Sequence, residues 1–402
     1  MPTRLSFRVY GLGLFAMVFA VNAPAPLFES FRRTLNLGPD ELALLYSVYS
    51  LVIISTLPIS GKLSDWFGRR ASVLVGLALA AAGCAVLGAC DSLEWLLVGR
   101  LLQGLAVAAM SAPTAAALAE LAPSGPAAGA LAATLAMAFG GALGPLLAGV
   151  MAETGMVSPM AFAAALAVLA MLGVAVVAEP PRTPRASPAT PPTPRVQRGA
   201  AFWQSCAAVI LAFGVQSTFF TISGPRFASL MTSHALLSAG VAMAVFMSAS
   251  GAGMLAARRL SAASAIGWGV ALLPIGICGF FSLVAAAPFA AVLASVLLAG
   301  AGHGLAYVGA LRRINATAPA AGRGAYTSQF YVAIYVGGGG PVLAMGALAR
   351  QVGLTAASTA FGLACAATAA ALLVSLWRTS VPGAKPGQGQ PGGCSGRRVE
   401  GG

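Results

Sequence analysis

Long apolar runs alternate with short polar or Pro/Gly-rich breaks along almost the whole chain. A helix that crosses a bilayer needs about 20 mainly apolar residues, and these runs are continuous rather than alternating as in barrel strands. The pattern therefore predicts an all-α integral membrane protein. Its twelve expected transmembrane helices lie at 9–28, 42–61, 71–90, 94–118, 127–151, 159–178, 201–222, 236–256, 264–285, 288–311, 325–348 and 354–377.

Two stretches lack the composition of a packed core. Residues 179–199 hold seven prolines and four arginines, which indicates an extended, solvated linker, and the Gly/Pro-rich residues after Arg378 are expected to be disordered. The expected organisation is a six-helix bundle over 1–178, a cytoplasmic linker over 179–199, a second six-helix bundle over 200–378 and a cytoplasmic tail over 379–402.

The start of the chain allows two interpretations. Arg4 and Arg8 precede the first apolar run, and Ala23-Pro24-Ala25 offers small residues at a spacing typical of signal-peptide cleavage. The run is long for a signal peptide, however, and eleven more spans follow it. We therefore favour an uncleaved first helix.

Composition excludes a soluble protein and a nucleic-acid binder. Only 8% of residues are charged and mean hydropathy is +0.86, whereas soluble domains carry about 25% charged residues. The net charge of +13 is spread among apolar runs, so it cannot form one dense face that tracks phosphates.

The basic residues instead predict the orientation. With an even number of spans, 18 of the 23 lie on the side of both chain ends and 4 on the other, while Arg100 lies inside a span. The positive-inside rule then predicts that both termini are cytoplasmic. The expected location is the inner (plasma) membrane.

The two halves of the chain echo each other at an offset of 196 residues. Gly104 corresponds to Gly300, the pair at 144–145 to the Gly-Pro pair at 340–341, and the Ala-Pro pair at 122–123 to that at 318–319. A parallel repeat of six helices is typical of transporters whose halves rock about a central site.

A motif with charges of both signs follows the second predicted span; its key residues are Gly61, Asp65, Gly68, Arg69 and Arg70. The glycines permit close helix approach and a tight turn, and the charges lie at a predicted cytoplasmic helix end. Asp65 is a candidate latch that holds one conformation through charge-assisted hydrogen bonds, and the alternative is a solvated loop with ordinary positive-inside charges.

This stretch, GKLSDWFGRR, resembles the loop signature of the major facilitator superfamily, although Trp66 stands where a basic residue is usual. The resemblance implies twelve transmembrane helices in two pseudo-symmetric six-helix bundles, and an aspartate, here Asp65, that stabilises the outward-facing state. In the second half Ala257 occupies the place of that aspartate, so we expect no charge latch there.

Arg100 begins a second candidate motif, Arg100-Leu101-Leu102-Gln103-Gly104, in the fourth span. A charge within a span is costly and normally faces a polar interior; the alternative is an arginine that snorkels to the outer interface. The motif is similar to the Arg-x-x-Gln-Gly motif of the superfamily, which implies a part in proton transfer for Arg100.

A third motif lies in the fifth span, with Gly140, Gly144, Pro145 and Gly149 in the sequence GGALGPLLAG. Its glycines allow neighbouring backbones to approach, and Pro145 removes one backbone hydrogen bond and bends the helix, so simple small-residue packing is the alternative. The pattern resembles an exporter motif of the superfamily associated with antiport, with Ala148 in place of one glycine.

Other polar groups within spans are scarce. Candidates to line a substrate cavity are Asn22, Gln103, Gln216, Tyr307 and Gln329, and His303 is a candidate for proton coupling because imidazole titrates near physiological pH. The alternative for each is an interhelical contact. No acidic residue lies clearly in mid-span, which argues against a specialist for organic cations and favours a neutral, zwitterionic or anionic amphiphile.

No metal cluster, phosphate loop or ATP-binding module is visible, and the six cysteines indicate packing. The expected protein is not an enzyme and needs no cofactor beyond a proton gradient. We expect a monomeric transporter, without a nucleic-acid partner, that exports a small amphiphile in exchange for protons. Two alternatives remain open, namely proton-coupled uptake of an organic acid or sugar and a non-transporting receptor on the same fold.

Overall fold

The computed structural model describes residues 2–177, 198–230, 233–283, 287–318 and 323–380. Within these, the side chains at 2–3, 57–67, 228–230, 323–325, 327–328 and 380 are not described. The expected linker over 179–199 and tail over 379–402 lie almost entirely outside this part of the chain.

Helices account for nearly all of the described residues, which contain no strand. Twelve α-helices have 18 residues or more, and they are joined by one short helix and two 3-10 turns: α1 (Pro2–Asn22), η1 (Ala25–Leu27), α2 (Phe28–Thr34), α3 (Pro39–Phe67), α4 (Arg69–Gly88), α5 (Leu93–Leu121), α6 (Pro126–Thr154), α7 (Pro159–Val176), α8 (Ala200–Leu230), α9 (Ala235–Ala256), η2 (Ala257–Arg259), α10 (Ala262–Leu283), α11 (Phe289–Thr317), α12 (Arg323–Val352) and α13 (Leu354–Ser380).

Eleven of the helical segments in the described residues are long and apolar enough to cross a membrane. The remaining long helix is α3, which has 29 residues and includes the undescribed side chains at 57–67. The predicted all-α membrane architecture is therefore confirmed. Several helices are longer than the apolar runs, as in α11, which continues to Thr317, because the hydropathy pattern detects only the lipid-buried part of a helix.

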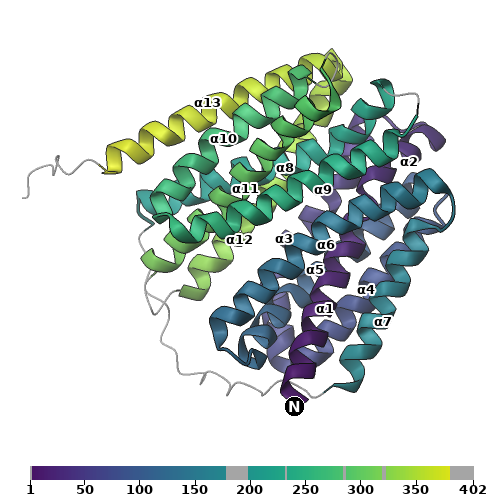
Figure 1. Cartoon of the computed structure of the whole chain (residues 1–402), viewed down its shortest axis with the longest axis vertical. Coiled ribbons are helices and arrows are strands. Elements are labelled where there is room, and N and C mark those ends of the chain that lie inside the picture. The colour runs from purple at the N-terminus through teal and green to yellow at the C-terminus, as the bar shows by residue number, and fades with distance from the viewer. Residues whose placement is uncertain (1, 178–197, 231–232, 284–286, 319–322, 381–402) are drawn as a thin grey trace, which may run out of the picture.

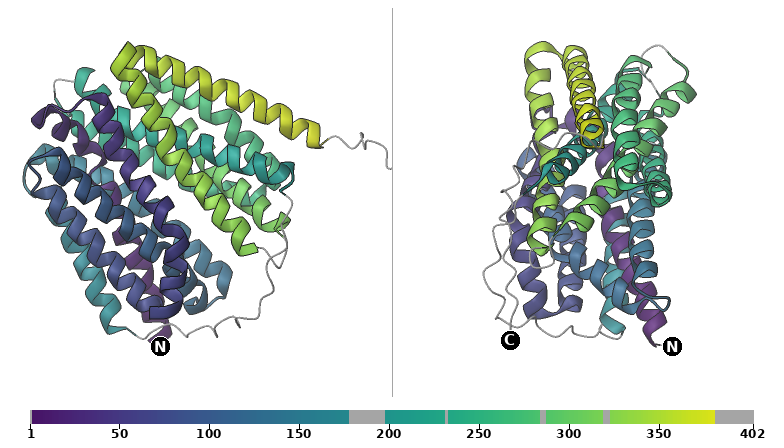
Figure 2. Two further views of the ribbon diagram at one scale, coloured as in Figure 1. Left: turned by 180° about the vertical axis from the view of Figure 1, so that it is seen from behind. Right: turned by 90° about the vertical axis from the view of Figure 1, so that its left-hand side faces the viewer.

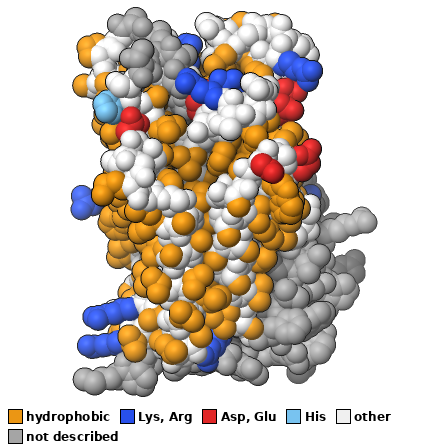
Figure 3. Space-filling model, turned by 90° about the vertical axis from the view of Figure 1, so that its right-hand side faces the viewer, with side chains coloured by type: hydrophobic (Ala, Val, Ile, Leu, Met, Phe, Trp, Pro, Cys, Tyr) orange, Lys and Arg blue, Asp and Glu red, His pale blue; other side chains and the backbone are white. Residues whose placement is uncertain are grey.

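The surface supports the same conclusion. Figure 3 shows apolar side chains over the middle of the molecule, with charged groups gathered toward its two ends. Large apolar side chains of the long helices are exposed, among them Leu169, Trp268 and Leu363 at 62–67% exposure. Apolar surface of this extent is stable against lipid and not against water.

The helices alternate in direction, so their ends lie on two faces. We call the side where α1 begins and α13 ends the terminal face, and the side of η1 and α2 the far face. Gly68, which separates α3 from α4 on the terminal face, has a φ of 87°, a conformation that side chains with a Cβ rarely adopt. This geometry is the tight turn predicted at that glycine.

Two antiparallel helix pairs join helices α1–α7 to helices α8–α13, and Figures 1 and 2 show these two sets by colour. In the pair of α3 and α12, Arg350 NH1 lies 2.6 Å from Asp40 Oδ2, and Ser47 Oγ donates to the Gly339 carbonyl at 3.1 Å. Between these two contacts, Gly346 packs against Ala43.

In the pair of α6 and α9, glycines bring the backbones together. A Cβ on Gly240 would lie 2.6 Å from the Pro145 carbonyl oxygen, and one on Gly149 would lie 2.8 Å from the Leu236 carbonyl oxygen. In the last turn of α6, Glu153 accepts from the His234 backbone N–H at 3.0 Å and lies 3.1 Å from His234 Nδ1.

The contacts between the two sets run from the far face to mid-helix. In the α6–α9 pair, Gly251 packs against Ala138 near the middle of both helices. The halves are therefore closed on the far side of the molecule.

Candidate substrate cavity

A cavity of about 340 Å³ lies between the two halves. The long helices that line it are α1, α3, α5 and α6 from the first half and α8, α9, α11 and α12 from the second. These are the first, second, fourth and fifth long helices of each half, so the lining follows the repeat seen at an offset of 196 residues. A site at the interface of two repeats is the usual position of a transporter binding site.

Arg100 reaches this cavity from α5 and is 3% exposed. Its Nε donates to the Leu45 carbonyl at 3.3 Å, and its NH1 donates to the Val21 carbonyl at 3.2 Å and to Gln103 Oε1 at 2.6 Å. The guanidinium thus ties α5 to α1 and α3. It does not snorkel to the outer interface, which was the alternative interpretation of its sequence position.

Three aromatic rings surround the same guanidinium. The Arg100 Cζ lies 4.9 Å from the ring centroid of Tyr49, 5.4 Å from that of Phe28 and 5.7 Å from that of Tyr46. Rings at these distances stabilise a buried cation by about 0.5–2 kcal/mol each. No ion pair joins Arg100 to a carboxylate in the described part of the chain, so carbonyls, an amide and π faces compensate its charge.

Gln103 lies behind the cavity wall and holds Arg100 in place through a hydrogen bond. It is completely buried, accepts from Arg100 and donates from Nε2 to the Ala20 carbonyl at 3.0 Å. The spacing of three residues on α5 puts both side chains on one face of the helix. Gln103 therefore positions the arginine, and it is not among the residues that line the cavity.

His303 lines the opposite side from α11 and is 2% exposed. Its Nδ1 lies 2.8 Å from Ser250 Oγ, and its Nε2 has no hydrogen-bond partner among the described residues. The flanking Gly302 and Gly304 let α11 pack closely on α10 and α9, which brings Ser250 to the imidazole. An unpaired buried nitrogen at a cavity wall is a group that a ligand or a proton can satisfy.

Of the other predicted cavity residues, three line the cavity and one does not. Asn22, Gln216 and Tyr307 line the cavity, although the Asn22 amide also donates to Val18 in its own helix at 2.8 Å and Gln216 Nε2 lies 3.4 Å from Met247 Sδ. Gln329 is on α12 and is not among the lining residues.

The glycine motif of the fifth span lies where three helices meet. Gly140 and Gly144 pack against α1, since a Cβ on either would lie 2.7 Å from the carbonyl oxygen of Phe15 or Phe19. Pro145 and Gly149 instead face α9 of the other half. The motif thus supplies both the packing of α6 within its half and its contact across the halves.

The charged motif on the terminal face is only partly described. Gly61 and Asp65 belong to α3, and their side chains lie outside the described residues. Arg69 forms an ion pair with Glu120 at the end of α5, and Arg70 is half-buried at the start of α4. The Arg69–Glu120 contact had no signal in the sequence, because nothing in the charged motif indicates that the start of α4 meets the end of α5.

Sequence reasoning also missed a buried acid. Glu29 is 2% exposed and accepts from Arg32 Nε and Arg33 Nε, both at 2.7 Å. Glu29 is therefore paired and lies at the far end of the molecule, and Arg100 is the charged residue in the described cavity wall.

The tyrosines at 46 and 49 carried a usable signal, because a spacing of three residues places both on the face of α3 that meets Arg100.

Comparison with known proteins gives a family match over most of the chain. The model of the Major Facilitator Superfamily matches residues 10–341. A 149-residue segment is 27% identical to the uncharacterized MFS-type transporter YybF of Bacillus subtilis, an 85-residue segment is 34% identical to the bacillibactin exporter of the same organism, and a 117-residue segment is 36% identical to the human proton myo-inositol cotransporter. These segments cover 37%, 20% and 29% of the chain and only 36%, 21% and 18% of the respective relatives.

Solved structures share the fold at low sequence identity. A bacterial homologue of the human lysosomal transporter Spinster, in an inward-facing and occupied conformation, superposes with a TM-score of 0.73 at 14% identity, over 92% of this chain and 96% of that one. A point mutant of the nucleoside transporter NupG superposes with a TM-score of 0.74 at 12% identity, over 94% and 100% of the two chains.

Proposed function

Because the chain belongs to the major facilitator superfamily, we propose that it is a proton-coupled transporter that exports a small amphiphilic compound by alternating access. It is a multi-pass membrane protein of a transporter family, so the expectation that it is not an enzyme is confirmed. Export, proton coupling and the cytoplasmic placement of the terminal face are our proposals.

The observation that carries this proposal is the cavity between the halves. Both halves contribute lining residues, and the described contacts between them hold the far side together. With the terminal face in the cytoplasm, this is a state closed to the outside. Transport then requires that the α3–α12 and α6–α9 contacts separate on the far side.

The cavity wall favours an anionic or zwitterionic amphiphile. Phe220, Met247 and Tyr335 provide apolar and aromatic surface, and Arg100 provides the positive charge. The described wall has no carboxylate to neutralise an organic cation, and burying such a cation without a partner is costly. Tyr307 and Gln216 supply hydrogen-bonding groups that suit a polar head.

Relatives of both transport directions resemble this chain. The bacillibactin exporter supports export, and the antiport-like motif at 140–149 supports it as well. The proton myo-inositol cotransporter supports proton coupling but favours the alternative of uptake. A receptor without transport is disfavoured by the charged motif at 61–70, which such a protein would not need.

A cell-based comparison separates export from uptake. A strain that lacks this protein is exposed to a panel of anionic, zwitterionic and cationic amphiphiles, with and without the protein restored. Export predicts higher intracellular accumulation of at least one anionic or zwitterionic compound in the deletion strain, and lower accumulation on restoration. Higher accumulation on restoration would select uptake instead.

Asp65→Asn is expected to leave a folded protein that transports at least about tenfold more slowly. The change removes a charge at the terminal end of α3 and keeps the size of the side chain, so it weakens the proposed latch without creating a cavity. Transport by purified protein in liposomes, normalised to the monodisperse fraction, measures the effect. Wild-type rates would remove the gating role.

His303→Gln is expected to abolish the dependence of transport on an imposed pH gradient while substrate still binds. Glutamine keeps hydrogen-bonding capacity toward Ser250 but cannot take up a proton. The measurement is substrate flux in liposomes at several pH differences, with Ser250→Ala as the control that removes the hydrogen bond and keeps the imidazole. An unchanged pH dependence in His303→Gln would assign the proton to another group.

A further inference from the structure

The cavity between the halves gathers aromatic rings. Phenylalanine, tryptophan and tyrosine make up 8% of the chain, yet they supply eight of the 33 residues that line this cavity. Five of the seven tyrosines in the whole chain are among them, namely Tyr46, Tyr49, Tyr307, Tyr331 and Tyr335. Aromatic side chains pack favourably against other flat rings, edge to face or offset, so a wall of this composition favours an aromatic ligand.

Four of these tyrosines follow one another from the first half to the second. Tyr335 of α12 lies within electrostatic range of Tyr49 on α3 and of Tyr331 one turn away on its own helix. The hydroxyls of Tyr331 and Tyr307, on α12 and α11, share a hydrogen bond. We call Tyr49, Tyr335, Tyr331 and Tyr307 the tyrosine row. Within it, Tyr335 is the residue of the second half that comes next to the first half.

A buried cation with unused donors lies at the Tyr49 end of this row. The Arg100 Cζ is 4.9 Å from the Tyr49 ring centroid. Three of the five N–H donors of Arg100 bind carbonyls and Gln103, and the two on its other terminal nitrogen have no partner among the described residues. The neighbouring Tyr46 hydroxyl also has no hydrogen-bond partner in the described part of the chain. An anionic ligand would supply both the missing counter-charge and the missing acceptors.

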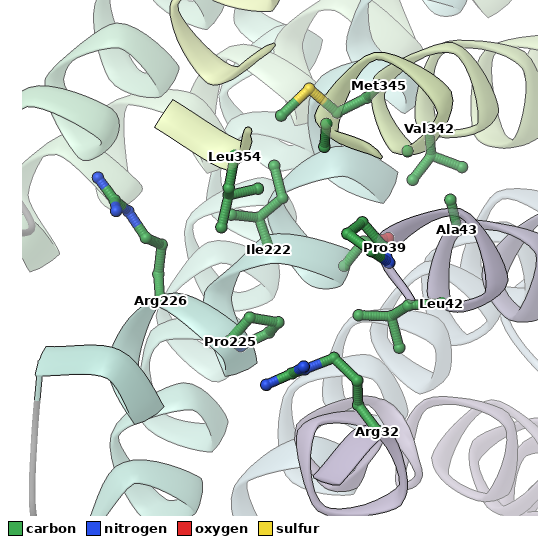
Figure 4. A pocket seen from close by; sticks show the side chains of 13 residues that line it. Arg32, Pro39, Leu42, Ala43, Ile222, Pro225, Arg226, Val342, Met345 and Leu354 are labelled. Atoms are coloured by element: carbon green, nitrogen blue, oxygen red, sulfur yellow. The ribbon is translucent and has the colours of Figure 1, made fainter. Parts of the chain in front are cut away.

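A second cavity of about 340 Å³, between the halves near the far face, does not combine these features. Figure 4 shows Arg32 below it and Arg226 at the left, with Met345 toward the upper right. No aromatic ring is among its described lining residues. Glu29 already holds Arg32 through Nε at 2.7 Å and a terminal nitrogen at 2.9 Å. The aromatic wall is thus a property of the central cavity and not of every space between the halves.

We propose that the substrate is an aromatic monoanion, with its carboxylate at Arg100 and its ring against Tyr335. This inference rests on the proposed function and narrows its substrate from an anionic or zwitterionic amphiphile to an aryl acid. The first half then holds the head of the ligand, and the second half contacts the ring, so Tyr335 determines specificity. The cavity volume of about 340 Å³ is at the small end of the roughly 300–1,000 Å³ typical of ligand sites, which suits a fused two-ring acid.

The test is equilibrium binding to the full-length protein in nanodiscs of zwitterionic lipid, with binding to empty nanodiscs subtracted. The probes are 2-naphthoate, its saturated analogue decahydro-2-naphthoate and the neutral 2-naphthamide. We expect 2-naphthoate to bind about tenfold more tightly than the saturated acid, because only the flat ring can stack on tyrosine. It is also expected to bind about tenfold more tightly than the amide, which brings no charge to Arg100. Equal affinity for the two acids, or for the acid and the amide, would overturn the proposal.

Variants of Tyr335 test the ring contact. Tyr335→Leu is expected to remove most of the preference for 2-naphthoate over the saturated acid, whereas Tyr335→Phe keeps the ring and the preference. Phe139→Leu is the matched control, because Phe139 is 57% exposed and does not line the cavity. The ratio of the two affinities does not change when part of the protein is misfolded, so a merely structural role would leave it unchanged. An undiminished preference in monodisperse Tyr335→Leu would contradict the role given to this residue.

Failure of this inference can be told apart from failure of the proposed function by measuring flux on the same protein. If the two acids bind equally while another anion or zwitterion is exported under a pH gradient, the aromatic class is wrong and the transport function stands. If 2-naphthoate binds with the expected preference while no compound moves under the gradient, the aromatic site stands and the proposed transport function fails.

Discussion

Arg100→Gln is expected to lower transport at least tenfold while reducing the thermal stability of the protein. The guanidinium donates to carbonyls of α1 and α3 and to Gln103, and hydrogen bonds to a charged group contribute about 1.5–3 kcal/mol each. Glutamine is too short to reach the Val21 carbonyl of α1 and the Leu45 carbonyl of α3 together. The cavity therefore loses its positive charge and also the hydrogen bonds that hold these helices to α5. Flux in liposomes, normalised to folded protein, measures the loss.

Arg100→Lys separates charge from geometry. Lysine keeps the positive charge but lacks the planar fork, so it cannot reproduce the donors to Leu45, Val21 and Gln103 together. A partial recovery of anion transport relative to Arg100→Gln would assign part of the effect to charge. Arg259→Gln, at an exposed position, is the control and is expected to transport normally. Wild-type flux in Arg100→Gln would contradict the role given to this residue.

Gly240→Ala is expected to reduce transport at least tenfold by keeping the far side from closing. The added Cβ would lie 2.6 Å from the carbonyl oxygen of Pro145, a backbone atom that no side-chain rotation can move away. The α6 and α9 backbones must then separate, and the far-closed state becomes less populated. The measurement is the distance distribution between spin labels on the far ends of α6 and α9, together with flux.

Gly340→Ala is the matched control for this change. Gly340 is also a helical glycine of the second half, but a Cβ there meets nothing within 4 Å among the described atoms. Both substitutions favour the helix to the same extent, so only the contact across the halves differs. Equal distances and equal flux in the two variants would show that the α6–α9 contact does not control closure.

Helix number and order could be predicted from the sequence because the bilayer imposes a length on each apolar run. The twelve expected spans fall on the twelve long helices, and the largest differences are at helix ends, where polar residues continue the helix beyond the lipid. The glycines at 140 and 144 were assigned to close packing, and they do pack on α1. Local sequence sufficed because spacing within one helix determines which residues share a face.

Contacts between distant segments could not be predicted in the same way. Asp40 and Arg350 are 310 residues apart, and Glu153 and His234 are 81 apart, and each is an ordinary helix-end charge when the sequence is considered alone. The partners of Arg100 were also hidden, because backbone carbonyls have no sequence signature. Glu29 likewise looked like the end of a span, whereas the turn into α2 buries it beside two arginines.

The measurement that tests the central claim most directly is flux by the purified protein in liposomes under an imposed pH gradient. We predict that an anionic or zwitterionic amphiphile moves against its own gradient in exchange for protons, that a protonophore stops this movement, and that Asp65→Asn slows it at least tenfold. The account is contradicted if no compound in such a panel moves under the gradient while a known antiporter, reconstituted in parallel, transports its substrate.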